Sequence, residues 1–165
     1  VLNRVASLFR RRGFNIESIA VGHSELPNFS RMTIVVDGTT TSVEQVRKQL
    51  EKVVEAVKVS DITAEPSVNR ELALIKVKAT PDTRSDIIQI VDIFRANIVD
   101  VASDSVTIEV TGDEDKVNSL LQLLRGFGIR EISRTGRIAM TRGTIGSLPL
   151  EERTTRGGTA RRKAS

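Results

Sequence analysis

One order of predicted strands and helices occurs twice along the 165 residues of this chain. In the second half, hydrophobic spacing predicts strand 72–79, a helix that starts at Thr80-Pro81, strands 98–102 and 106–111, a helix capped by Asp113, and strand 129–133 with 138–140 as an extension. In the first half, it predicts a helix that ends at Gly13, strands 14–22 and 31–37, a helix opened by Ser42, and strand 57–64. The second half therefore has the order βαββαβ, and the first half has the same order without its opening strand.

The order βαββαβ is that of the split βαβ, or ferredoxin-like, motif. We therefore expect an α+β fold with two ferredoxin-like βαββαβ units, of which the first, 1–65, lacks its first strand and the second is 66–143. From residue 144 the chain is rich in Gly, Thr, Ser and Arg, which predicts a disordered basic tail over 144–165. Because the first helix begins at once without a capping residue, we also expect a chain cut at its N-terminus.

Helical spacing of apolar residues predicts which helix faces are buried. We expect the following side chains to lie in the core: Leu2, Val5, Leu8, Phe9, Val43, Val46, Leu50, Val53, Val54, Ile87, Ile90, Val91 and Phe94. Ser42 and Gln45 have the spacing of a capping box, in which the two residues bond each other's backbone N–H.

Composition excludes several classes of chemistry. The chain has no Cys and a single His, His23, so disulfides, thiolate metal sites and catalytic His pairs are excluded, and we expect no metal site and no catalytic residue. No apolar run is long enough to span a membrane. Of the net charge of +4, residues 151–165 supply +3, which leaves the rest of the chain almost neutral. These features are typical of a cytoplasmic protein without membrane or nucleic-acid partners.

Three functions remain open on the residues alone. Carboxylates that converge in space could form an enzyme site. A ferredoxin-like sheet could stack RNA bases on strand aromatics, although the only aromatic residues are five Phe, none in the middle of a strand. The third reading, a sensor of small ligands or a protein-binding module, requires no catalytic side chain and fits best.

Several segments closely resemble the regulatory (small) subunit of acetolactate synthase, also called acetohydroxyacid synthase. The resemblance runs from residue 1 to about 143, and its most specific parts are RGFNIES at 12–18, SRMTI at 30–34, NREL at 69–72, IFRA at 93–96, IVDV at 98–101, RTG at 134–136 and TRG at 141–143. It implies an N-terminal ACT domain followed by a ferredoxin-like domain. An ACT-type amino-acid sensor that acts on another partner is the alternative.

The resemblance also implies a function. Such subunits bind the large catalytic subunit, raise its activity, and confer feedback inhibition by valine or a related branched-chain amino acid. They have no catalytic activity or cofactor of their own, since thiamine diphosphate, magnesium and FAD belong to the catalytic subunit. They form homodimers through their ACT domains.

Site residues follow from the same resemblance. Asn15 and Ile16 match positions that line the effector pocket of the family. Four further positions match residues linked to the effector response: Asn3, Val21, Gly22 and Gln45. Family members begin with a strand and a short acidic, glycine-containing loop, whose backbone N–H groups would hold the effector carboxylate. Neither precedes the first helix of this sequence.

Overall fold

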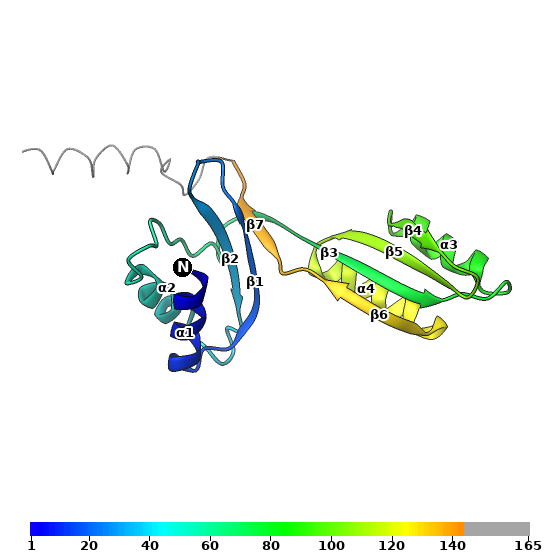
Figure 1. Ribbon diagram of the computed structural model, residues 1–165, viewed down its shortest axis with the longest axis horizontal. Helices are drawn as coiled ribbons and strands as arrows, with labels where there is room; N and C mark the ends of the chain where they lie inside the picture. The colour runs from blue at the N-terminus through cyan, green and yellow to red at the C-terminus, as the bar shows by residue number, and fades with distance from the viewer. Residues whose placement is uncertain (144–165) are drawn as a thin grey trace, which may run out of the picture. The chain divides into compact units, whose positions relative to one another are not determined.

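The computed structural model describes residues 1–143, and the predicted tail 144–165 lies outside the described residues (Figure 1). The fold is α+β, as predicted, and divides into two compact units. The first consists of Val1–Val68 with the segment from Met140 onward, and the second of Asn69–Ala139.

The second unit has the predicted βαββαβ order. Its elements are β3 (Ser67–Lys78), α3 (Arg84–Ile93), β4 (Asn97–Val101), β5 (Ser105–Gly112), α4 (Glu114–Leu124), the short 3-10 helix η1 (Arg125–Phe127) and β6 (Ile129–Arg134). The strands form one antiparallel sheet in the order β4-β5-β3-β6, which is the ferredoxin-like arrangement. The short strand β7 (Ile138–Thr141) also pairs with β3, which begins five residues before the predicted start.

The core of this unit lies between one face of the sheet and the two helices. Alternate residues of β3 point into it, and Ala73, Ile75 and Val77 have no exposed surface. From the helices, the core receives Ile87 and Val91 of α3 together with the following residues of α4: Val117, Leu120, Leu121 and Leu124. Buried residues thus recur at every second position in the strand and about every 3.6 positions in the helices, so both kinds of element turn one apolar face to the same core.

Local signals set the helix ends, with one correction. Asp113 caps α4 as predicted, since its carboxylate accepts a hydrogen bond from the Lys116 N–H at 2.9 Å. The prediction that Pro81 is the first residue of α3 is wrong, because the helix begins at Arg84. The Thr80 N–H donates to the Thr83 hydroxyl at 2.9 Å, and the Thr83 N–H donates to the Thr80 hydroxyl at 3.3 Å. These two bonds hold Pro81 in a turn before the helix.

The first unit is a layered structure, in which α1 (Leu2–Arg12) and α2 (Val43–Glu51) lie beside the antiparallel hairpin of β1 (Ile16–His23) and β2 (Ser30–Val36) (Figure 1). Its buried centre consists of Val5, Phe9 and Val46. Gly13 ends α1 with a positive φ of 65°, a conformation that glycine adopts without strain.

Three predictions for this unit are wrong. The segment 57–64 forms no strand. In the second unit the fourth strand pairs with the first, and the corresponding first strand is not in this sequence, so the segment lacks the neighbour that would make it a strand. Helix α2 ends at Glu51, so Val54 lies beyond it and is 88% exposed. Leu2, the first residue of α1, was predicted to lie in the core but is 49% exposed.

Candidate effector site

The turn between α1 and β1 carries the two residues that the resemblance assigns to the effector. Asn15 is held on three sides: its backbone N–H donates to the Thr41 hydroxyl at 3.1 Å, its side-chain amide donates to the Asp37 carboxylate at 3.2 Å, and its carbonyl accepts from the Asp37 N–H at 3.0 Å. Ile16 follows and packs half-buried against the small core. The turn is therefore fixed by the segment after β2.

Asp37 is the centre of this arrangement. It accepts hydrogen bonds from the backbone N–H of Thr39 at 2.9 Å, from the Thr39 hydroxyl at 2.6 Å and from the Thr40 hydroxyl at 3.2 Å. These bonds, above all the one from the Thr39 side chain, hold the pKa of the Asp37 carboxyl below its ordinary value of 3.8, and the Asn15 amide adds to this. The carboxylate is therefore charged at neutral pH.

The exposed side of this turn can still bond a ligand. The side-chain oxygen of Asn15 accepts no hydrogen bond from any described residue, and an amide oxygen can take two. It therefore offers an acceptor to an ammonium group, beside the half-buried aliphatic surface of Ile16. The sequence predicts a turn at Asp37-Gly38 but did not assign Asp37 and its threonines to the site, although the run DGTTT at the end of the predicted strand 31–37 is a signal for such a hydroxyl-capped turn.

The other four predicted residues lie elsewhere in the first unit. Val21 and Gly22 are exposed and near the far end of β1, six or more residues from Asn15, which corresponds to about 20 Å of extended chain. Asn3 and Gln45 face two hollows on the surface of the helices. The structure therefore places Asn15 and Ile16 together and the other four apart from them.

Gln45 also tests the predicted capping box. Its backbone N–H donates to the Ser42 hydroxyl at 3.4 Å, so Ser42 caps α2 as predicted. Among the described residues, however, the Gln45 side chain makes no return bond to the Ser42 N–H. Half of the capping box is formed, and the Gln45 amide is left at the surface.

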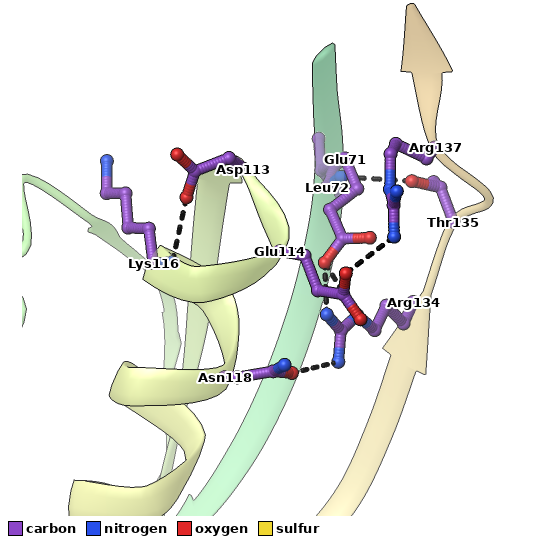
Figure 2. A network of polar contacts seen from close by, with 9 residues as sticks. All are labelled: Glu71, Leu72, Asp113, Glu114, Lys116, Asn118, Arg134, Thr135 and Arg137. Carbon is purple, nitrogen blue, oxygen red and sulfur yellow. Dashed lines mark hydrogen bonds and ion pairs between the residues drawn. The ribbon is translucent and has the colours of Figure 1, made fainter. Parts of the chain in front are cut away.

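A polar network in the second unit connects two of the motifs that carry the resemblance. Figure 2 shows Glu71 of β3 pointing toward Arg134, the last residue of β6. The Glu71 side chain is 6% exposed, and its carboxylate accepts from the Arg134 guanidinium, which also donates to the side-chain oxygen of Asn118 at 2.8 Å. The next residues pair as well, because the Leu72 N–H donates to the Thr135 hydroxyl at 2.9 Å.

This network has a structural role. It joins NREL at 69–72 to RTG at 134–136, 63 positions apart in the chain, and Arg137 extends it to Glu114 at 2.6 Å. Glu71, Arg134 and Arg137 each have a partner of opposite charge, so none of these three side chains carries an unpaired charge (Figure 2). It fixes where β6 ends.

Residues 1–143 contain no group of three or more metal-ligating side chains arranged to hold an ion. No helix among them is long and apolar enough to cross a lipid bilayer.

Comparison with known proteins gives matches across both units. A family model described as "AHAS small subunit-like ACT domain" matches residues 1–58, and one described as "Small subunit of acetolactate synthase" matches residues 70–143. The chain is 60% identical over 143 residues to the "Probable acetolactate synthase small subunit" of Archaeoglobus fulgidus, with 87% of this chain and 89% of the relative covered. It is 51% identical over 146 residues to the acetolactate synthase small subunit of Bacillus subtilis, with 87% and 84% covered.

A solved structure shows the same fold. The crystal structure of the acetolactate synthase small subunit from Thermotoga maritima has a TM-score of 0.78 to this chain, is 46% identical, and is matched over 90% of its own length and 87% of this chain. The ACT domain expected for the first unit is confirmed by the first family model. On these matches, which run through both units, the chain belongs to the family of acetolactate synthase small subunits.

Proposed function

We propose that this chain binds the catalytic subunit of acetolactate synthase, raises its activity, and makes it sensitive to feedback inhibition by valine in the biosynthesis of branched-chain amino acids. The observation that carries the proposal is the match of both units to small-subunit family models, with relatives of 50–60% identity that bear that name. The complex works in the cytoplasm. Thiamine diphosphate, magnesium and FAD are bound by the catalytic subunit, and this chain has no cofactor.

The side chains support a regulatory role over a catalytic one. The charged residues of the second unit's network are paired with each other, and the carboxylate of Asp37 is occupied by hydroxyl groups. The RNA-binding alternative would need aromatic side chains on strands, whereas the five Phe of the chain all lie in helices, turns or loops. The described residues thus give no specific support to the enzyme or to the RNA-binding alternative.

The proposed effector site is the turn at Asn15 and Ile16. The Asn15 oxygen accepts from the valine ammonium, and Ile16 contacts the isopropyl group. Valine has about 8 heavy atoms, and the binding free energy of so small a ligand reaches at most about 1.5 kcal/mol per atom. Submillimolar affinity requires a binding free energy of about 5 kcal/mol. An open turn would leave much of the isopropyl group in water, so a homodimer of ACT domains, with Asn15 near its two-fold axis, closes the site.

A reconstitution experiment tests this function. The purified chain is assayed for acetolactate formation from pyruvate, alone and with the purified catalytic subunit, over a range of valine concentrations. We expect no product from the chain alone, a higher rate of the catalytic subunit when the chain is added, and loss of that rate with valine. Product formed by the chain alone, or a catalytic subunit that neither binds it nor responds to it, would contradict the proposal. The second result would favour a sensor that acts on another partner.

A further inference from the structure

The outer surface of α1 and α2 carries two adjoining hollows, of about 290 and 390 Å³, which share Gln49. We call them together the α1–α2 groove. It belongs wholly to the first unit. Neither Asn15 nor Ile16 lines either hollow, but Phe14, directly before Asn15, lines the first one. Every charged side chain that lines it is a cation: Arg4, Arg11, Arg12, Lys48 and Lys52.

The charge of the groove is only partly balanced. Arg4 and Lys48 each pair with a glutamate, at 2.9 and 3.4 Å. Arg11, Arg12 and Lys52 are exposed, and their side chains form no ion pair or hydrogen bond with any described residue. Three unpaired cations around one groove create a positive potential that attracts an acidic ligand.

The floor of the groove is largely apolar, since its half-buried lining residues are Leu8, Phe14 and Val53 together with the polar Ser7 and Gln49. Val54 also lines the groove but is 88% exposed, so it adds apolar surface beside the floor. An apolar floor with a cationic rim is the general pattern of a protein-binding site, in which apolar contacts supply affinity and charges at the rim supply orientation and association rate. The ligand that complements both parts has apolar side chains on one face and carboxylates beside them.

Charge argues against two other occupants of the groove, namely the C-terminal segment of this chain and a second copy of the chain. Residues 151–165 carry five basic and two acidic residues, so this segment would be repelled by the groove. A second copy that used the same surface would place like charges against each other, which is unfavourable. A nucleic acid would meet the apolar floor, and it would also meet Glu44 and Glu55, which neighbour the rim cations.

We infer that the α1–α2 groove binds an acidic, partly apolar segment of the catalytic subunit. This inference rests on the proposed function and adds the surface that makes the contact. Helix α1 then connects the two regulatory sites, because it lines the groove with Arg11 and Arg12 and ends three residues before Asn15. A partner in the groove and an effector at the turn act on the same helix.

Charge reversal tests the inference, with a control on the same helix. Arg11→Glu and Lys52→Glu change the groove, whereas Arg10→Glu makes the same change on an exposed residue of α1 that does not line it. The concentration of each chain that gives half-maximal activation of the purified catalytic subunit is measured. We expect it to rise about tenfold or more for the groove variants and less than about twofold for Arg10→Glu. Added salt should weaken activation by the wild type more than by Arg11→Glu.

The outcomes separate this inference from the proposed function. If the wild-type chain does not activate the catalytic subunit, the proposed function is wrong, and this inference is wrong with it. If the wild type activates and both groove variants match Arg10→Glu, the groove is not the contact and the inference is wrong. RNA binding by the wild type that Arg11→Glu abolishes, with activation unchanged, would also overturn it. Circular dichroism checks the fold of each variant, and Arg11→Gln replaces Arg11→Glu if that chain is unfolded.

Discussion

At the scale of single residues, Asn15 connects the segment after α1 to the segment after β2. Its own side chain uses one amide N–H for the Asp37 carboxylate and leaves the amide oxygen open. One residue therefore contributes to the local structure and offers a group to a ligand. The structural contribution is small, because an exposed hydrogen bond contributes only about 0.5–1.5 kcal/mol to stability. A substitution of Asn15 should therefore affect ligand binding more than folding.

We expect Asn15→Ala to abolish inhibition by valine while activation of the catalytic subunit is largely kept. The variant should lose at most about 1.5 kcal/mol of unfolding free energy, since the lost side-chain bond is exposed. Activity of the reconstituted enzyme with and without valine gives the test. Glu17→Ala, an exposed neighbour on β1, is the control. Loss of activation with inhibition retained would show that Asn15 is not at the effector site.

The lowered pKa of Asp37 predicts a dependence on pH. Because the folded state holds the pKa of the carboxyl below its unfolded value of 3.8, the charged form stabilises the fold above about pH 4, and this contribution is lost as the pH falls through the folded-state pKa. Asp37→Ala should therefore melt below the wild type at pH 7, and the difference should shrink below pH 3.8. Thermal melts between pH 3 and pH 7 measure it. A difference that is constant or grows toward low pH would contradict the assignment.

At the scale of elements, α4 offers a matched pair of leucines. Leu121 is 6% exposed in the core, and Leu123, two residues later on the same helix, is 51% exposed. Leu121→Ala should cost about 2–5 kcal/mol, because it deletes buried methyl groups and leaves a cavity. Leu123→Ala should stay within about 0.5 kcal/mol. Urea unfolding followed by circular dichroism gives both values, and equal effects of the two substitutions would refute the assigned face of α4.

The elements also show which features a sequence can predict. Helix α4 and the hairpin β1–β2 were predicted, because apolar periodicity and the Asp113 cap act within a few residues. The segment 57–64 was predicted wrongly, because a β-branched run becomes a strand only beside another strand. The early start of β3 has the same cause, since β7 pairs with it from more than sixty positions away. Local patterns carry no information about such partners.

The candidate site follows the same division. Asn15 and Ile16 could be singled out only by the resemblance, since neither residue has a local signal for ligand binding. The contact of Asn15 with Asp37 spans 22 positions, and the pairing of Glu71 with Arg134 spans 63. The α1–α2 groove joins residues of α1 to residues at and just after the end of α2. These features require the packing of two segments, so they could not be read from either segment alone.

At the scale of the whole molecule, the two units differ in the size of their cores. Among the described residues, the core cluster of the second unit has 14 buried members, whereas that of the first has three. Stability scales with buried apolar area, at about 25 cal/mol per Å². In this chain, which lacks the first strand of that unit, the first unit is therefore the less stable one.

We therefore expect two unfolding transitions, with the first unit melting before the second. Amides of β1 and β2 should exchange with deuterium faster than amides of β3 and β5, because opening of the small core costs less free energy. Valine binds the folded first unit in our proposal, so at about ten times its dissociation constant it should add about 1.4 kcal/mol to that unit alone. It should raise the lower transition in calorimetry and slow exchange in β1, and leave the upper transition unchanged. A single transition with equal exchange in both units, or a valine effect on the second unit only, would show that effector binding and local stability are not coupled in this way.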